Sequence, residues 1–407
     1  MTTTHAPAAT TPRLLPGTRE FSELLTRIGA GAGDRDRNDE NPFDQVRALK
    51  EAGFGTLRLP VESGGAGFTV RQLFSTVIDV AHADPIVAHI FRTHFWFTEE
   101  RLRTSSDPYS RRWLDEVAAG KIVGNAFSEK GAVAVGSPNF ATRLTTGDGE
   151  YRLTGEKFYS TGTLFADYLT VATSTDRGSV ATVVVPTDRA GVEIIDDWDG
   201  FGQRRTGTGT TNFTDVVVRP EEILSEATAD DEAIPTVQFA SLQLYIHAVV
   251  AGILAAVVDD GVALLRSRTR TFAHASAENA TDDPLLQRAL GELAGTANAV
   301  RAVVLDAADA LDAATASERD GVPDADLAHE AQLKATKVKV FVDAVAPKAA
   351  TDLLELGGAS ASSRQRNLDR HWRNIRTITL HNPVAYKARV IGENLLHGTP
   401  VPANPYF

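Results

Sequence analysis

The sequence contains no cysteine and a single methionine, which is its first residue. The lack of cysteine excludes disulfide bonds and thiolate catalysis, and it restricts any zinc site to histidine and carboxylate ligands. His89 and His94 are five residues apart and do not share a helix face, so they do not form a ligand pair. We therefore expect no metal site.

Long apolar runs and basic clusters are also missing. The longest apolar run, residues 246–258, contains His247 and is too short to span a bilayer, so it predicts a buried helix. The formal net charge of -12, without any Lys/Arg block, disfavours nucleic acid and anionic membranes as partners. The first residues lack the charged start and apolar stretch of a signal peptide. We expect a cytoplasmic protein that begins with a flexible tail, residues 1–18.

What the chain does have is an ordinary globular composition, with 407 residues, 43% hydrophobic and 23% charged. This length favours two or three packed units. Residues 19–121 show mostly helical spacing of apolar side chains, interrupted by a Gly-rich turn at residues 62–67. They predict an N-terminal helical domain.

Short β-rich runs separated by turn residues follow between residues 122 and 224, and they predict a compact antiparallel barrel or sandwich. These runs span residues 151–154, 168–173, 180–186 and 210–218. Residues 225–407 contain four long helical candidates, which favour an antiparallel four-helix bundle. The candidates span residues 236–273, 284–316, 325–357 and 368–396. The expected fold class is α+β, with a helical domain, a β domain and a helical bundle in that order.

Motifs along this framework occur in the order of a known family. They are Asn125-Ala-Phe-Ser-Glu-Lys130 followed by Gly136-Ser137, Gly155-Glu-Lys-Phe-Tyr-Ser-Thr-Gly162, Gly200-Phe-Gly-Gln-Arg-Arg-Thr-Gly207, Phe213-Thr-Asp-Val-Val-Val218 and Leu354-Glu-Leu-Gly-Gly358. The ordered set spans nearly the whole chain and resembles the acyl-CoA dehydrogenase superfamily. This resemblance implies the acyl-CoA dehydrogenase-like fold, a bound flavin and a homotetramer with the bundle at its core.

Residues 371–383 lack a carboxylate where that superfamily places its catalytic base. The positions matching the family's Tyr-Glu-Gly are His381, Asn382 and Pro383. A dehydrogenase needs a carboxylate to take the α-proton, and Asn382 is neutral. Some members place the glutamate elsewhere, so Glu355 and Glu393 keep open an alternative, an FAD-dependent acyl-CoA dehydrogenase or nitroalkane-oxidase-like flavoenzyme.

The ending Thr-x-Thr-Leu-His-Asn-Pro at residues 377–383, together with His94, is more similar to the oxygenase branch, the two-component flavin monooxygenases such as the dibenzothiophene monooxygenases. In that branch a separate NAD(P)H-dependent reductase supplies reduced flavin. O2 then forms a flavin C4a-hydroperoxide, which passes one oxygen atom to sulfur, nitrogen or carbon. The resemblance thus implies oxygenation of a small apolar or aromatic substrate. The branch often has a histidine and an aspartate where this chain has Ile378 and Asn382, which leaves proton handling open.

The resemblance also implies the residues of the site. The candidate catalytic residues are His94, His381 and Thr161. The candidate cofactor-binding residues are Asn125, Ser128, Tyr159, Thr161, Arg268, Arg270 and Asn382. An aromatic ring suits one face of an isoalloxazine, and amides suit its polar edge, which is costly to bury unpaired. A structural role is the alternative for His94, in an aromatic cluster, and for His381, as a loop histidine. Five other histidines are expected to be structural or on the surface, namely His82, His89, His247, His274 and His371.

Two altered motifs bear on the type of flavin. Arg268-Thr-Arg-Thr-Phe-Ala273 has its arginine out of register with the family's Arg-x-x-Phe-Gly, and residues 354–360 depart from Gln-x-x-Gly-Gly-x-Gly at two positions. In the family both motifs hold the adenosine diphosphate part of FAD. The changes favour FMN, used in its reduced form, with FAD as the alternative. Arg268 or Arg270 can clamp a phosphate through two N–H groups, or can be a helix-surface arginine.

Overall fold

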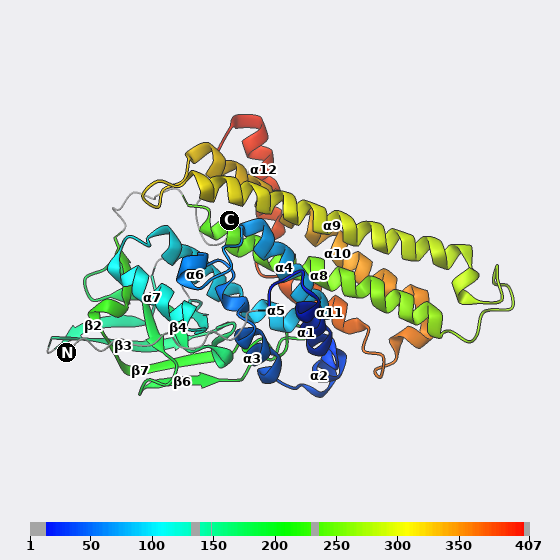
Figure 1. The fold of residues 1–407 in the computed structure, drawn as a ribbon, viewed down its shortest axis with the longest axis horizontal. Helices are drawn as coiled ribbons and strands as arrows, with labels where there is room; N and C mark the ends of the chain where they lie inside the picture. The colour runs from blue at the N-terminus through cyan, green and yellow to red at the C-terminus, as the bar shows by residue number, and fades with distance from the viewer. Residues whose placement is uncertain (1–13, 132–138, 148, 229–235, 403–407) are drawn as a thin grey trace.

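The computed structural model describes residues 14–131, 139–147, 149–228 and 236–402. Most of the predicted tail and the Gly136-Ser137 motif lie outside these ranges. The sheet lies at one end of the long axis and the tip of the bundle at the other, while α1 to α5 lie alongside the bundle in the middle of the molecule (Figure 1). The predicted fold class, with a helical domain, a β domain and a helical bundle, is confirmed.

The N-terminal domain is helical because apolar residues recur on one face of each segment and caps define the ends. In α4, Thr69 and Gln72 form a capping box. In α5, Pro85 occupies the first turn, where its missing N–H costs nothing. The side chain of Asp84 accepts hydrogen bonds from the N–H groups of Ile86 and Val87. The helices are α1 Arg19–Gly29, α2 Ala32–Asn38, α3 Phe43–Glu51, α4 Val70–Ala83, α5 Pro85–Ile90, α6 Arg92–Arg103 and α7 Pro108–Ala118. Helices α5 and α6 both contact α8, and α6 also contacts β1, so this pair joins the β domain to the bundle.

The four predicted β-rich runs are confirmed as strands, and four shorter strands complete one mixed sheet. The strands are β1 Val123–Ala126, β2 Arg143–Gly147, β3 Glu150–Lys157, β4 Tyr168–Thr175, β5 Val180–Pro186, β6 Val192–Ile195, β7 Thr210–Val218 and β8 Ile223–Ala227. Their order is β6-β7-β3-β2-β4-β5-β8, with β1 beside β4. The prediction of a purely antiparallel sheet was wrong, because β4 pairs in parallel with both β1 and β2. Strand β1 enters the sheet directly from α7, without a hairpin that would reverse its direction.

A buried ion pair holds the sheet to the segment after β1. Lys157, at the end of β3, is completely buried, and its Nζ lies 2.7 Å from Oε1 of Glu129. Glu129 also accepts hydrogen bonds from the backbone N–H groups of Ala141 and Thr142. Although partial burial raises the pKa of Glu129, the hydrogen bonds from Lys157 and Thr142 lower it to about 2. The pair therefore remains charged at neutral pH.

Replacing Glu129 by glutamine is expected to lower the free energy of unfolding by about 3–5 kcal/mol, because the Lys157 ammonium would remain buried without its counter-charge. Chemical denaturation at pH 7 measures the change. Glu150→Gln is the control, since the pair of Glu150 with Arg152 is largely exposed and such pairs contribute about 0–1 kcal/mol. Equal effects of the two substitutions would contradict this assignment.

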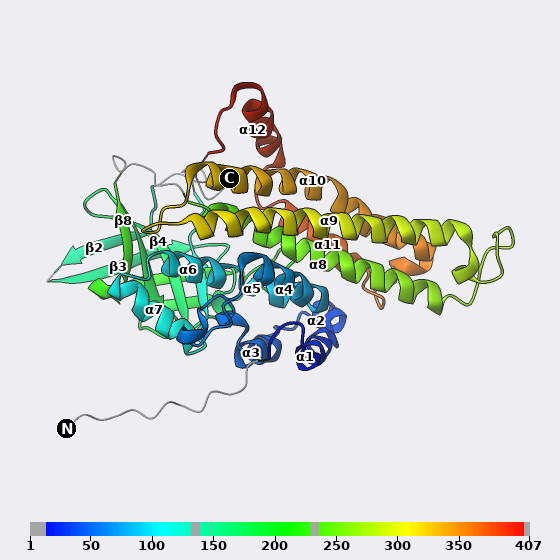
Figure 2. The same cartoon turned by 45° about the horizontal axis from the view of Figure 1, so that its top comes forward.

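The C-terminal part contains three long helices and two shorter ones. They are α8 Gln238–Ser267, α9 Pro284–Ser317, α10 Ala325–Gly357, α11 Asp369–Thr379 and α12 Val384–His397. The predicted single helix over residues 368–396 was wrong, because the chain breaks between α11 and α12. Pro383 lacks an N–H and disfavours helical geometry at Asn382, so one helix cannot continue through them. Helix α12 projects beyond the bundle (Figure 2).

Helix α8 lies at the centre of the molecule, in contact with α4, α9 and α10. Its length and composition would allow it to cross a membrane, but 61% of its most apolar window is buried inside the protein. The residues from Leu244 to Leu254 are almost all fully buried. The prediction that residues 246–258 form a buried helix is therefore confirmed.

Candidate active site

The turn after β3 brings the β domain against α5. Gly162 has a φ of 83°, and a Cβ there would lie 2.7 Å from the carbonyl oxygen of Ile90, the last residue of α5. Only glycine allows this approach. Thr161, the residue before Gly162, begins a chain of hydrogen-bonded hydroxyl groups. Oγ1 of Thr161 lies 2.9 Å from Oγ1 of Thr208, and Oγ1 of Thr208 lies 2.6 Å from Oγ1 of Thr206. Thr161 is thereby held at the junction of the two domains.

This line of contacts ends at His89 in α5. The hydroxyl of Thr206 donates to the carbonyl oxygen of Gln203, whose Oε1 lies 2.8 Å from Nδ1 of His89. The contact places the hydrogen of His89 on Nδ1, and burial lowers the pKa of His89 to about 4, so the ring is neutral near pH 7. Within the described part of the chain, Nε2 of His89 and Nε2 of Gln203 are buried without a hydrogen-bond partner. Two such polar atoms on neighbouring side chains indicate a ligand site.

A second link between the domains runs through Asn125 of β1. Its Oδ1 accepts a hydrogen bond of 2.7 Å from the hydroxyl of Thr93 in α6. Gly124 precedes it, and a Cβ there would lie 3.1 Å from Cα of Thr163, so β1 lies close to the turn that carries Thr161. Ser128 forms an isolated bridge with Phe158 through its backbone. Two predicted cofactor-binding residues, Asn125 and Thr161, therefore lie near each other around α5 and α6.

Accessible aromatic rings border this junction. Tyr159 is 51% exposed and packs edge-to-face against Trp198, with ring centroids 5.9 Å apart. Phe201 stacks on Trp372 of α11. Tyr159 and Gln203 both have positive φ, 55° and 53°, an unusual conformation for residues other than glycine that concentrates at functional sites. Backbone strain and unburied rings therefore occur in the same small region as the unpaired polar atoms.

His94 is placed differently from the expectation of a catalytic histidine. It is completely buried, its Nε2 donates to the carbonyl oxygen of Gly55 at 2.8 Å, and its Nδ1 accepts the backbone N–H of Val123 at 3.4 Å. Burial lowers the pKa of His94 to about 4. Both ring nitrogens thus hold the backbone of two elements together, and this geometry matches the structural alternative.

His381 lies in the link between α11 and α12 and meets α6. Its Nε2 accepts a hydrogen bond of 3.3 Å from Nη1 of Arg92. The His381 side chain is accessible to solvent, yet the surrounding protein is dense enough that burial, together with the charge of Arg92, holds the pKa of His381 well below its usual range. The neighbouring Asn382 is buried and donates through Nδ2 to Oε1 of Gln243 in α8 at 3.1 Å.

The carboxylates considered as possible bases are paired with other side chains or lie away from His381. In α10, Asp343 lies 2.8 Å from Nζ of Lys339 and 3.5 Å from Nε2 of His247, and all three side chains are buried. Glu393 pairs with Arg389 along α12. Glu355 is exposed near the end of α10, about 18 Å along the helix from Asp343 at 1.5 Å per residue. Neither alternative glutamate therefore faces the junction in this chain.

Arg268 lies far from the other predicted site residues of the same chain. Arg268 caps the far end of α8 and donates to the carbonyl oxygen of Leu356. Gln243, at the junction, is 25 residues earlier on the same helix, which corresponds to about 37 Å. That Arg268 and Arg270 bind the cofactor therefore stays a prediction, and within one chain α8 holds Arg268 away from Gln243.

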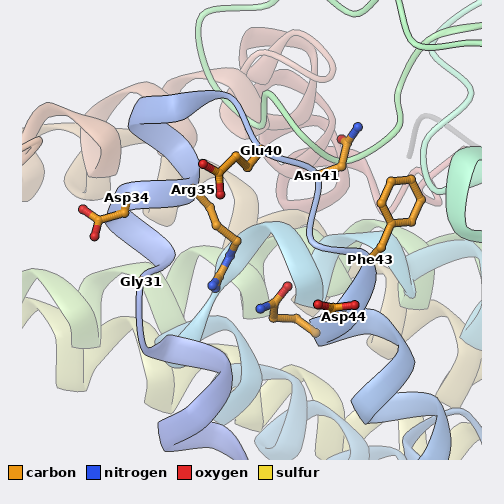
Figure 3. A pocket seen from close by; sticks show the side chains of 8 residues that line it. Gly31, Asp34, Arg35, Glu40, Asn41, Phe43 and Asp44 are labelled. Atoms are coloured by element: carbon orange, nitrogen blue, oxygen red, sulfur yellow. The ribbon is translucent and has the colours of Figure 1, made fainter.

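A separate hollow of about 420 Å³ opens on the N-terminal domain (Figure 3). Its wall comes from α2, α3 and the segment between them, including Arg35, Glu40, Asn41 and Phe43. None of the predicted site residues lines it. The position of the chemistry is thus set by the junction residues and not by this hollow.

The residues at the junction fit a flavin. Accessible aromatic rings suit the faces of an isoalloxazine, and Asn125, Thr161, His89 and Gln203 bring amide, hydroxyl and imidazole groups to a region that suits its polar edge. The unpaired buried atoms supply what a ligand with several carbonyl and N–H groups would satisfy. The described residues contain no group of three potential metal ligands.

Comparison with known proteins agrees with this reading. Acyl-CoA dehydrogenase family descriptions match residues 18–121 (N-terminal domain), 125–216 (middle domain) and 244–386 (C-terminal domain). The dibenzothiophene monooxygenase of Rhodococcus erythropolis is 30% identical over 399 residues, which cover 93% of each chain. The fold, a site without a free carboxylate and these relatives define a flavin-dependent monooxygenase. The chain belongs to the acyl-CoA dehydrogenase family, in its monooxygenase branch.

Solved structures show the same relationship. FMN-bound TdsC from Paenibacillus sp. A11-2 superimposes with a TM-score of 0.86 at 29% identity, over 95% of this chain and 98% of that chain. TdsC with FMN and indole matches equally well, with a TM-score of 0.86 at 28% identity, over 96% of this chain and 100% of that chain. Butyryl-CoA dehydrogenase from Megasphaera elsdenii, with a TM-score of 0.78 at 19% identity over 95% of this chain and 100% of that chain, shares the fold alone.

Proposed function

We propose that this chain is the oxygenase component of a two-component FMN-dependent monooxygenase. It takes reduced FMN from a separate NAD(P)H-dependent flavin reductase and uses O2 to oxygenate a small apolar or aromatic substrate at sulfur, nitrogen or carbon. The proposal depends mainly on the junction, where Thr161, Asn125, His89 and His381 lie together and the described residues provide no unpaired carboxylate. The FMN held by the related TdsC supports the choice of cofactor.

Bound reduced FMN would supply the electrons and the site at which O2 is activated. The protein's own residues would hold the flavin and transfer a proton. Asn125 and Thr161 would bind the polar edge of the ring, while Tyr159 and Trp198 would cover an aromatic face. His381 would pass a proton to or from the oxygen being activated, because its neutral ring has one N–H donor and one acceptor nitrogen.

The structure suggests different roles for His89 and His94. His89 presents an unprotonated Nε2 to the junction, so we assign it to ligand binding as a hydrogen-bond acceptor. His94 connects Gly55 to Val123 and so fixes α6 against β1, which positions Thr93 on Asn125. We therefore assign His94 a positioning role and keep His381 and Thr161 as the candidate catalytic residues.

The dehydrogenase alternative finds no base in the described residues. Asn382 donates to Gln243, Asp343 is paired with Lys339, and the two glutamates considered from the sequence lie elsewhere. A hydride-removing flavoenzyme would lack the carboxylate that takes the α-proton. This arrangement favours oxygenation.

We further propose a cytoplasmic homotetramer. Within one chain, Arg268 is about 37 Å from Gln243, so a phosphate clamp from Arg268 would come from another copy. Helix α12 exposes Tyr386, Leu395 and Leu396, each more than 60% accessible, which suits burial between copies. Light scattering of the purified protein at micromolar concentration tests this; a monomer that still binds FMN would contradict it.

The proposed function is tested with reduced FMN, ¹⁸O₂ and the neutral probes thioanisole and indole. We expect products carrying one ¹⁸O atom only when a flavin reductase and NADH, or photoreduced FMN, are present. Oxidised FMN alone and protein-free mixtures are the controls. Reduction of the bound flavin by butyryl-CoA without any reductase would instead support the dehydrogenase alternative and overturn the proposal.

A further inference from the structure

Arg92, the first residue of α6, brings a positive charge to the junction without a counter-charge. Its Nε donates to the carbonyl oxygen of Leu242 at 3.0 Å and its Nη1 contacts His381. No ion pair connects Arg92 to a carboxylate in the described part of the chain, although many other arginines there form one. Burial lowers the pKa of Arg92 to about 10, which still leaves the guanidinium charged at neutral pH.

The groups around Arg92 do not neutralise it. From α8, Tyr245 donates to the carbonyl oxygen of Ala88, and burial raises its pKa well above the usual value, so it is not a phenolate. From α10, the carboxylate of Asp343 is matched by Lys339. The other titratable neighbours are His89, His247 and His381, which carry no negative charge. The junction is therefore locally positive in a protein whose formal net charge is -12.

A partly desolvated guanidinium without a counter-charge is unfavourable, and an anion that reaches it recovers the lost interaction. Two features place this anion beside the reacting atoms and away from the cofactor phosphate. Arg92 contacts His381, and Thr93, the next residue, holds Asn125, which we assign to the ring of the flavin. The accessible aromatic rings of Tyr159 and Phe201 border the same region.

We propose that the substrate is a small aromatic or apolar acid whose oxyanion, a carboxylate or a sulfur oxyanion, is held by Arg92. The proposal rests on the proposed function and names its substrate class. Arg92 is then a specificity-determining residue, because its guanidinium can donate two parallel hydrogen bonds to a planar or forked oxyanion. For an aryl sulfinate the balanced reaction is RSO2⁻ + FMNH2 + O2 → RSO3⁻ + FMN + H2O; for a thioether acid the same oxygen atom is added to the thioether sulfur.

The test measures binding to the FMN-loaded protein by calorimetry, with 4-(methylthio)benzoate and the neutral isostere 4-(methylthio)benzamide as probes. Wild-type protein is expected to bind the acid at least about tenfold more tightly than the amide, the range of one charge-assisted hydrogen bond. In Arg92→Gln this ratio is expected to fall to about one. Arg92→Lys should retain part of the preference, because the charge remains while the fork is lost.

Arg288→Gln is the matched control, since Arg288 is a surface residue paired only with Glu292 along α9, and its ratio should equal that of the wild type. The affinities of FMN and riboflavin are measured for each variant. Equal binding of acid and amide by the wild type, or an unchanged ratio in Arg92→Gln, would overturn the inference. A selective loss of FMN affinity over riboflavin in Arg92→Gln would also overturn it, because Arg92 would then hold the phosphate. If the acid preference holds but reduced FMN and O2 oxygenate neither probe, the proposed function fails while the anion site stands.

Discussion

Replacement of His381 by alanine is expected to lower oxygenated product by about 10²–10⁴-fold, the usual contribution of a positioned acid or base. Consumption of reduced FMN should continue, with H2O2 formed in place of product, because the ring that exchanges the proton is gone while the flavin contacts of Asn125 and Thr161 remain. The measurement is product formed per reduced FMN consumed, together with peroxide release.

His397→Ala is the control for this substitution, because His397 is an exposed histidine at the end of α12. His381→Gln adds a second test, since its amide can still accept from Arg92 but cannot carry a proton near neutral pH. Normal coupling in His381→Ala would assign this residue to the loop-histidine alternative. Normal coupling in His381→Gln alone would show that the hydrogen bond and not the proton matters.

The second large effect expected is a loss of stability between pH 6.5 and pH 4 that depends on buried histidines. Burial lowers the pKa of His94 to about 4 in the folded protein, whereas an unfolded histidine titrates near 6.5. Between these values the unfolded chain binds more protons, so the free energy of unfolding falls as pH falls. The shift of about 2.5 units corresponds to roughly 3 kcal/mol. Stability from this group is complete above pH 6.5 and lost by about pH 4.

Other groups titrate in the same range, and burial raises the pKa of Glu318 to about 7, which acts in the opposite direction. The histidine contribution is therefore isolated by comparing wild type with His94→Gln in urea titrations from pH 7 to pH 4. Glutamine can still donate to the carbonyl oxygen of Gly55, so the variant should fold, with a lower stability at pH 7 but a shallower pH dependence. Parallel curves for the two proteins would contradict the assignment, and His397→Gln should follow the wild type.

The helices of the bundle were predictable because their apolar spacing continues over many turns. The prediction for residues 325–357 coincides with α10, and that for residues 284–316 differs from α9 by one residue. The last candidate failed at one place, where Pro383 interrupts an otherwise helical pattern. Strands β1, β2, β6 and β8 were missed because they are short and their stability comes from pairing partners far along the chain.

The site was only partly predictable. Asn125, Thr161 and His381 were named from the resemblance, and the structure brings all three to the junction. Arg92 and Gln203 were missed, although Gln203 lies within the Gly200–Gly207 motif and Arg92 is two residues before His94. Their importance comes from contacts between residues far apart in the sequence. Gln203 contacts His89, which is 114 residues away, and Arg92 contacts His381, which is 289 residues away.

The sequence by itself determined the class of fold, the order of the domains and the absence of a carboxylate beside His381, because periodicity and residue identity are local properties. Only the tertiary structure decided which side chains meet. Packing ties both ring nitrogens of His94 to backbone groups and buries Nε2 of His89 without a hydrogen-bond partner among the described residues. It also leaves Arg92 charged without a carboxylate partner in the described part of the chain. Helix α8 separated Arg268 from the site by its length alone. These outcomes depend on packing between residues distant in sequence, which no local pattern records.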